Sequence, residues 1–306
     1  MNHYPVLLNE MLTALRPQDN QTYIDATFGA GGYSTAILNA AKCHLIAFDR
    51  DKNVQEFATK LSEKFNDNFD FNLARFSQIK STLSEKNITK VDAIIADIGV
   101  SSMQLDTQDR GFSFNKDAPL DMRMGECQTS AYEVVNNMDE KQLADILWHF
   151  GEEKRSRKIA KKIIEIRAQE HIKTTTQLAQ IVSDIYPKKY YKTHPATKSF
   201  QAIRIYVNQE LEELKELLND SLDLLNPGGR LIIVSFHSLE DKIVKDFMRT
   251  HSGYNDRNQS RYEPQTKTTK SYPLELPSQK ATKPTKEELS ENIRSRSARL
   301  RYIIKL

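Results

Sequence analysis

One stretch, residues 23–34 (YIDATFGAGGYS), constrains the fold of this chain more than any other. It predicts the end of a buried strand, a turn of small residues and the start of a helix. Glycine lets the backbone turn tightly and approach a ligand closely, and the N–H groups at a helix start face whatever lies in the turn. A second apolar run, 45–48, leads into Asp49, 24 positions after Asp25. In α/β nucleotide-binding domains a carboxylate at this place takes the ribose hydroxyls, so we predict an α/β fold and a cofactor that contains ribose.

The spacing of the glycines distinguishes between two classes of cofactor. A dinucleotide-binding turn has the pattern GxGxxG, but here Ser34 stands at the third glycine position. The stretch instead resembles DxGxGxG, the first motif of class I S-adenosylmethionine methyltransferases, with Thr27 in place of its first glycine. A glycine-rich turn that binds no ligand is the alternative interpretation.

The composition sets limits on the class of protein. A chain of 306 residues is long enough for two domains, and its net charge of +3 means that any nucleic-acid surface must come from local clusters. Cys43 and Cys127 give no disulfide framework or zinc spacing, and the scattered histidines give no metal triad, so we expect no metal. No apolar run approaches 18 residues and no signal peptide is evident. We therefore expect a cytoplasmic protein that does not contact a membrane.

The alternation of strands and helices is interrupted in the middle of the chain. Residues 91–97 form a near-continuous apolar run, as in a strand buried on both faces of a parallel sheet. Helical patterns follow up to residue 195. The β/α alternation then resumes with a single long helix expected over 200–225 and a strand after the turn at 226–229. A last strand at 300–304 is expected to pair with one near 274–278.

These patterns predict a Rossmann-like, doubly wound and mostly parallel sheet that an antiparallel hairpin closes, with an inserted all-helical domain. We place the methyltransferase core in residues 1–107 and 196–306. The insertion, residues 108–195, is the expected substrate-binding domain for RNA.

Candidate site residues follow the expected strands. Asp97 ends the fourth strand, where amino-directed methyltransferases place an acceptor for the substrate amine; a turn cap is the alternative. Phe76, after the third strand, suits a neighbour of the adenine ring or a core position. His237 stands beside Ser238 and Asp241, but no GxSxG elbow supports a hydrolase. We interpret Ser238 as a helix N-cap and His237 as a candidate catalytic contact to the substrate.

The insertion carries two groups of candidate substrate contacts. Arg110, Phe112 and Phe114 suit stacking on an unpaired base with a phosphate contact, or equally a hinge core between the domains. Residues 154–173 hold eight basic side chains against two acidic ones, and they neighbour the basic stretches 188–192 and 194–198. They form a phosphate-binding surface or a solvated helix face. The most central of them are Lys158, Lys161 and Lys162. The tail adds Arg294, Arg296, Arg299, Arg301 and Lys305.

Together these stretches resemble the ribosomal RNA small-subunit methyltransferase H family from one end of the chain to the other. The matching segments are 3–8, 25–33, 48–51, 97–106, 110–114, 119–124, 194–204, 226–242 and 294–301. The resemblance implies an S-adenosylmethionine-dependent methyltransferase that modifies N4 of one cytidine in the decoding region of 16S rRNA. The cofactor contacts that it implies are Gly31, Gly32, Tyr33, Asp49, Phe76, Asp97 and Gln104. Tyr33 stands where family members often carry histidine.

Two other functions compete with this hypothesis. A small-molecule or protein N-methyltransferase would use the same fold, but the basic insertion favours RNA. A non-catalytic RNA-binding protein would not need the glycines at 29, 31 and 32 together with Asp49 and Asp97. The sequence is compatible with a homodimer without deciding the oligomeric state. It also leaves open whether free 16S rRNA or the small ribosomal subunit is bound.

Overall fold

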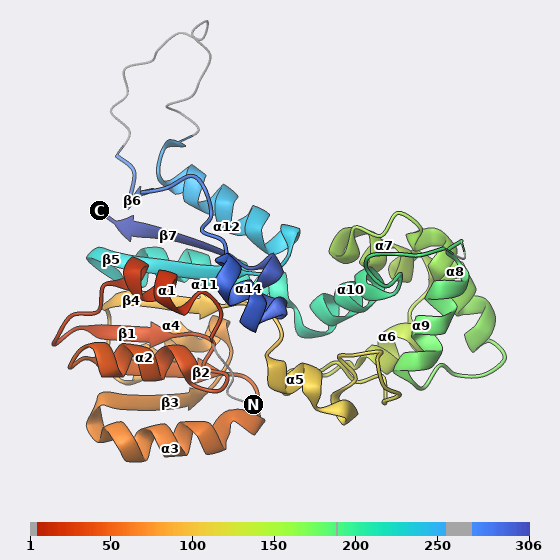
Figure 1. Ribbon diagram of the computed structural model, residues 1–306, viewed down its shortest axis with the longest axis horizontal. Helices are drawn as coiled ribbons and strands as arrows, with labels where there is room; N and C mark the ends of the chain where they lie inside the picture. Colours follow the sequence, from red (N-terminus) through yellow and green to blue (C-terminus); the bar gives the residue numbers. More distant parts are fainter. Residues whose placement is uncertain (1–4, 188, 255–270) are drawn as a thin grey trace, which may run out of the picture. The chain divides into compact units, whose positions relative to one another are not determined.

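The structure is a computed structural model that describes residues 5–187, 189–254 and 271–306. It divides the chain into two compact units, shown in Figure 1. The sheet unit contains Met1–Gly99 and Leu211–Leu306, and the helical unit contains Val100–Glu210. Three stretches fall outside the described residues: 1–4, which include the start of the matching segment 3–8, then Lys188 of the basic stretch 188–192, and 255–270.

The sheet unit contains one seven-stranded sheet in the order β3-β2-β1-β4-β5-β7-β6. Strands β1 to β5 are parallel to one another, whereas β7 is antiparallel to both β5 and β6. This is the expected class I methyltransferase topology with its antiparallel end. The strands are β1 (Thr22–Asp25), β2 (His44–Asp49), β3 (Phe69–Leu73), β4 (Val91–Asp97), β5 (Leu225–Ser235), β6 (Leu274–Glu275) and β7 (Arg299–Lys305).

Helices cover both faces of this sheet (Figure 1). Apolar side chains of α4, α11 and α12 share one core with the strands, including Leu83, Leu217 and Val244. In Figure 1, α1 and α2 lie in front of the sheet. The helices are α1 (Leu8–Leu15), α2 (Gly32–Ala40), α3 (Gln55–Phe65), α4 (Ile79–Glu85), α11 (Glu210–Leu224), α12 (Ser238–His251) and α14 (Lys286–Glu291). Among the described residues, no helix combines the length and apolar character that crossing a membrane requires.

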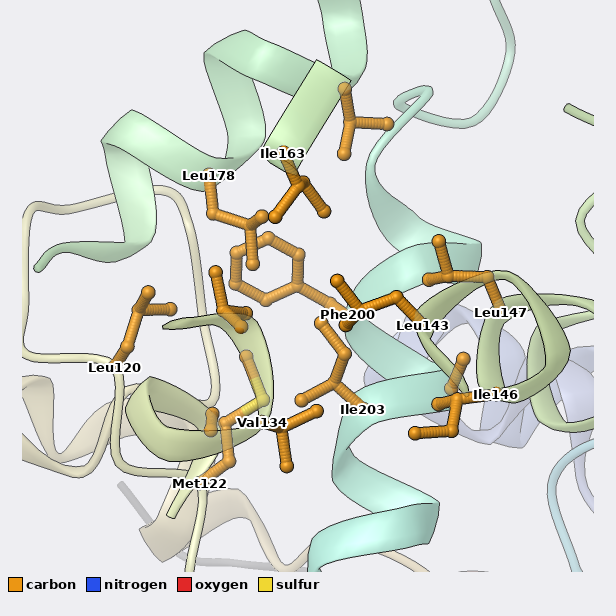
Figure 2. Packing of buried hydrophobic residues seen from close by; sticks show 14 of the residues in the cluster. Leu120, Met122, Val134, Leu143, Ile146, Leu147, Ile163, Leu178, Phe200 and Ile203 are labelled. Atoms are coloured by element: carbon orange, nitrogen blue, oxygen red, sulfur yellow. The ribbon is translucent and has the colours of Figure 1, made fainter. Parts of the chain in front are cut away.

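The helical unit has its own hydrophobic core, part of which Figure 2 shows. Capping boxes that start at Ser130, Asp139 and Thr174 satisfy the first N–H groups of α6, α7 and α9, which explains where these helices begin. The short helix α6 was not predicted from the sequence. The helices are α5 (Ser102–Asp106), α6 (Ala131–Asn137), α7 (Glu140–Gly151), α8 (Ser156–Arg167), α9 (Thr175–Asp184) and α10 (Thr197–Asn208).

The prediction of one long helix over 200–225 was wrong. Gln209 has a left-handed backbone (φ 53°) that ends α10, and α11 begins at the next residue. Phe200 and Ile203 of α10 belong to the helical core, as Figure 2 shows, so this helix is part of the helical unit. The junctions expected after residues 107 and 195 therefore move to residues 99/100 and 210/211.

Candidate active site

Three neighbouring strands of the sheet each end on an aspartate. Asp25 is the last residue of β1, Asp49 of β2 and Asp97 of β4. The strands are parallel and adjacent in the order β2-β1-β4, so their carboxyl ends share one edge of the sheet. Ligands of open α/β folds bind at this edge. The three side chains nevertheless have different surroundings, which separate their roles.

Asp25 holds the glycine turn together. Its buried carboxylate accepts hydrogen bonds from the Thr27 N–H (3.1 Å) and the Ser34 hydroxyl (2.6 Å), which ties the turn to the first residues of α2. Burial raises the pKa of Asp25 to about 6 despite these hydrogen bonds. Thr27 also accepts a hydrogen bond from the Asp97 N–H at its hydroxyl (2.6 Å). This contact explains why threonine replaces the first glycine of the motif.

Asp49 links the glycine turn to β2. One carboxylate oxygen accepts the Gly29 N–H and the other accepts the Asp51 N–H, both at 2.8 Å. Burial raises the pKa of Asp49 to about 6, and these two N–H groups work against the increase. Each carboxylate oxygen has a second lone pair, so Asp49 has acceptor capacity left for the two ribose hydroxyls expected from the sequence.

Asp97 differs from the other two aspartates in the surroundings of one carboxylate oxygen. Its Oδ1 atom is buried and has no hydrogen-bond partner among the described residues. Burial raises the pKa of Asp97 well above its usual range, and nearby negative charges raise it further. Those charges belong to Asp25, Glu240 and Glu288. An unpaired buried acceptor in a negative environment favours a cation or a strong hydrogen-bond donor, which suits the ammonium and sulfonium groups of S-adenosylmethionine or a substrate amine.

The described part of the N-terminal segment packs against the glycine turn. A Cβ atom on Gly32 would lie 2.3 Å from Pro5 Cγ, so the close approach of Pro5 requires glycine there. The Tyr33 hydroxyl donates a hydrogen bond to the Val6 carbonyl, and burial raises the pKa of Tyr33 and keeps it protonated. The Leu7 N–H donates to Glu288 Oε1 (3.0 Å). The Tyr33 side chain thus anchors the N-terminal segment. The backbone of Tyr33 is left for the expected contact with the cofactor.

Glu213 holds the loop that carries Phe76. Phe76 begins a 3₁₀ turn, Phe76–Gln78, which two residues separate from the end of β3, and its ring is half-buried against the sheet core. Glu213 of α11 accepts hydrogen bonds from the N–H and hydroxyl of Ser77, both at 3.2 Å. Arg75 Nη1 lies 3.7 Å from the same carboxylate. The sequence analysis missed Glu213 because nothing in the local pattern connects it to a loop 136 residues away.

His237, not Ser238, is the N-cap of α12, so the predicted cap was wrong. Its Nδ1 accepts the Glu240 N–H (3.4 Å), while Glu240 Oε2 accepts the N–H groups of Phe236 (2.8 Å) and His237 (3.2 Å). His237 Nε2 lies 2.9 Å from Glu240 Oε1 without the alignment of a hydrogen bond. The side chain thus has a structural role at the helix start. A contact of His237 with the substrate stays a prediction.

Comparison with known proteins identifies the family. A family model described as the MraW methylase family matches residues 1–306. The chain belongs to this family. It is 48% identical over 303 residues to the ribosomal RNA small subunit methyltransferase H of Maricaulis maris, covering 99% of this chain and 91% of the relative. The protein of the same name from Ehrlichia chaffeensis is 48% identical over 308 residues, which cover 99% of this chain and 100% of the relative. Membership confirms the resemblance and, with it, S-adenosylmethionine as the methyl donor.

Two solved structures show more distant likeness. An rRNA methylase from Streptococcus thermophilus is 11% identical with a TM-score of 0.41, and the match covers 100% of this chain and 99% of that one. A SAM-dependent O-methyltransferase from Thermotoga maritima is 8% identical with a TM-score of 0.41, covering 98% and 64%.

Four candidate residues of this MraW-family chain lie in the helical unit with local partners. Gln104 forms a capping box with Ser101 at the start of α5, in which Gln104 Oε1 accepts the Ser101 N–H. Arg110 donates to the Arg123 carbonyl (2.8 Å), and its guanidinium lies 5.5 Å from the Phe112 ring centroid. Phe112 is buried in the helical core, which favours the core interpretation over stacking on a base. Phe114 is half-buried, with its ring centroid 4.9 Å from that of Phe200.

The basic residues of α8 separate into structural and exposed groups. Arg155 and Arg167 donate to the carbonyls of Ile185 and Val135, which commits them to the helical unit. Lys162 lies 3.3 Å from Glu165. By contrast, Lys158 and Lys161 are exposed, as are Lys154 and Arg157. These four side chains remain as candidates for contact with phosphate.

Two arginines of the C-terminal tail pair with the buried Asp241, and Arg299 itself is exposed whereas Arg301 is largely buried. Arg299 Nη1 and Arg301 Nε each lie 2.7 Å from an Asp241 oxygen, and together they lower the pKa of Asp241. Both arginines hold β7 to the start of α12. A contribution of the exposed Arg299 to a basic surface stays a prediction. Arg296 is exposed.

Proposed function

We propose that this chain transfers a methyl group from S-adenosylmethionine to the exocyclic N4 amine of one cytidine in the decoding region of 16S rRNA, in the small ribosomal subunit. Membership in a methylase family gives the reaction class. The names of the relatives, which are 47–48% identical over nearly the whole chain, support ribosomal RNA as the substrate.

The observation that carries the proposal is the unpartnered Oδ1 of Asp97 at the end of β4. A cytosine amine shares its lone pair with the ring and is a weak nucleophile. An acceptor for its N–H lets the nitrogen become pyramidal and balances the positive charge that develops during attack. Asp97 supplies such an acceptor without losing another partner. Burial favours its neutral form, and the positive charge of the sulfonium and of the attacking amine would favour the ionised form that stabilises the transition state.

The other candidate residues of the sheet unit bind the cofactor and orient it. When bound, S-adenosylmethionine supplies an electrophilic methyl carbon on its sulfonium. We infer that Asp49 accepts the ribose hydroxyls and that Phe76 packs against adenine. The glycine turn, with left-handed backbones at Gly29 (φ 53°) and Gly31 (φ 76°), allows close approach of the ligand. Most of the rate enhancement then comes from in-line positioning.

Cys43 is a poor candidate for the nucleophile that methylation of a ring carbon would need. Methylation at C5 of a pyrimidine needs a thiolate that adds to C6 of the ring. Cys43 precedes β2 and thus lies at the amino end of the parallel strands, opposite the edge that carries the three aspartates. It is also buried, which raises its pKa to about 11. Cys43 therefore does not fit this role.

Nucleoside mass spectrometry of 16S rRNA tests the proposal. Cells that lack this protein should lose one N4-methylcytidine, and the purified chain should restore it with S-adenosylmethionine. Asp97→Asn should restore it far more slowly. Unchanged N4-methylcytidine in the deficient cells, or methyl transfer to C5 or to protein, would overturn the proposal.

A further inference from the structure

The most exposed aromatic side chain described in the helical unit is Tyr190, which is 90% exposed. It lies between α9 and α10 in what we call the Tyr190 loop, residues 185–187 and 189–192. An exposed ring is unusual when its neighbours in the chain are packed.

The rest of the loop is fixed to the helical unit. The Tyr186 hydroxyl lies 2.7 Å from each carboxylate oxygen of Glu153 and donates to that group, and the Arg155 guanidinium lies 4.6 Å from the Tyr186 ring centroid. Tyr191 packs edge-on against Tyr186, with centroids 5.7 Å apart, and its hydroxyl donates to the Pro187 carbonyl (3.0 Å). These contacts hold both sides of the loop, so Tyr190 projects from an anchored base.

The charge around this ring is positive. Lys189 and Lys192 on either side of it are exposed. Because Arg155 at the start of α8 contacts Ile185 and Tyr186, the exposed side chains of Lys154 and Lys158 belong to the same region. Residues 154–198 contain twelve lysines and arginines against three acidic residues, whereas residues 100–153 contain four against eleven.

We propose that Tyr190 stacks on an unpaired base of single-stranded RNA, while Lys189, Lys192 and the exposed start of α8 contact the flanking phosphates. A ring among lysines matches a ligand that alternates aromatic faces with negative charge. Proteins read RNA mainly at unstacked bases of single strands and loops. A membrane surface would need a larger apolar area than one ring. The identity of the RNA rests on the proposed function, but the binding surface itself does not.

Equilibrium binding of a short single-stranded RNA to the full chain, without cofactor, tests this inference. Stacking on one aromatic ring contributes enough that Tyr190→Ala should weaken binding roughly 5- to 100-fold, whereas Tyr190→Phe should bind within about twofold of the wild type. The slope of log affinity against log salt should not change in either variant. Lys189→Gln and Lys192→Gln should each reduce that slope by about 0.7. A duplex of the same sequence should not distinguish Tyr190→Ala from the wild type.

Trp148 of α7 provides a matched control. This residue is 53% exposed in the same helical unit, but it belongs to the acidic stretch, residues 100–153. Trp148→Ala should therefore leave RNA affinity unchanged, and because Tyr190 is exposed, Tyr190→Ala should keep the wild-type melting temperature. The inference is overturned if Tyr190→Ala binds like the wild type, if Tyr190→Phe loses as much as Tyr190→Ala, or if the wild type binds no single-stranded RNA. The binding measurement does not depend on methyl transfer. The inference about Tyr190 can therefore fail while the proposed formation of N4-methylcytidine is confirmed, or the reverse.

Discussion

The sheet unit and the helical unit carry charge in opposite ways. In the sheet unit, Asp25, Asp49 and Asp97 are held at one edge with raised pKa values, and one buried oxygen of Asp97 has no partner in the described part of the chain. In the helical unit, Lys158 and Lys161 are exposed on α8. Buried charge acts strongly at short range and is little screened by salt, whereas exposed charge is weakened by salt. The first arrangement suits one small cationic ligand, and the second suits a polyanion.

Asp97→Asn should have the largest effect and would test the sheet half of this comparison. Asparagine keeps the shape and an acceptor oxygen but loses the negative charge. We expect methyl transfer to slow by roughly 10²–10³-fold, as for other single electrostatic contacts in active sites. Single-turnover rates at saturating S-adenosylmethionine measure the effect.

The loss caused by Asp97→Asn should be the same at low and high salt. Full recovery of the rate at high cofactor concentration would show that Asp97 binds the ammonium group of the cofactor instead of the substrate amine. The contrast between buried and exposed charge would then survive, but the catalytic role of Asp97 would not.

Asp49→Ala should come next in magnitude. It removes the proposed ribose contact and also the carboxylate that accepts the Gly29 N–H. A hydrogen bond to a charged group contributes roughly 1.5–3 kcal/mol, so the Kd for S-adenosylmethionine should rise by about one to two decades. Calorimetry measures this, with Asp67→Ala as the control because Asp67 is exposed. An unchanged Kd would remove Asp49 from the site.

Charge reversal at Lys158 and Lys161 tests the helical half of the comparison. RNA affinity should fall about tenfold at moderate salt, and the slope of log affinity against log salt should decrease by at least about 1.4. Reversal at Lys162 should matter less because Lys162 lies 3.3 Å from Glu165. Lys141→Glu on α7, also exposed, is the matched control. If the slope does not move, these lysines only solvate a helix face.

Glu213→Gln should weaken S-adenosylmethionine binding by up to about tenfold, because the loop that carries Phe76 loses a charged acceptor. The rate at saturating cofactor should not change, since Glu213 acts through the loop. Glu216→Gln, one turn further along α11 and exposed, should have no effect. A lower saturated rate in Glu213→Gln would contradict a purely positioning role.

The smallest effect is a dependence of cofactor affinity on pH. The ionised form of Asp49 accepts the ribose hydroxyls, and its pKa in the folded protein is about 6. Affinity should therefore be complete above this pH, fall about twofold at pH 6, and fall further with each lower pH unit. Calorimetry across this pH range should show that cofactor affinity depends less on pH in Asp49→Asn than in the wild type. Equal pH dependence in the wild type and Asp49→Asn would assign the titration to another group.

Much of the sheet edge follows from the sequence because its signals are local. Buried parallel strands are continuous apolar runs, and the aspartates that end them follow directly in the chain. The glycine turn can be recognised from its residue types, since only glycine adopts the left-handed backbone without strain. The positions of Asp49 and Asp97 at one edge were therefore predictable before the structure, as was the antiparallel end of the sheet.

Local patterns failed where a residue's role depends on a distant partner. Phe112 and the tail arginines have the composition of an RNA-binding surface, but one is in the helical core and two are paired with Asp241. The break between α10 and α11 has no glycine or proline to mark it, because Gln209 adopts the left-handed conformation. Packing of α10 in the helical core decides that helix boundary, and no periodicity shows it.

The sequence by itself determined the fold class, the family and the edge of the sheet where the cofactor is expected, because strand patterns, turn chemistry and strand-end carboxylates depend on neighbours in the chain. Only the tertiary structure decided which charged side chains are paired within the protein and which can still bind a ligand. It showed that Glu288 accepts the N–H of Leu7, 281 residues away, and that one oxygen of Asp97 has no hydrogen-bond partner among the residues it describes. Burial and hydrogen-bond satisfaction are properties of the packed chain, so the chemistry of a side chain is known only when its surroundings are.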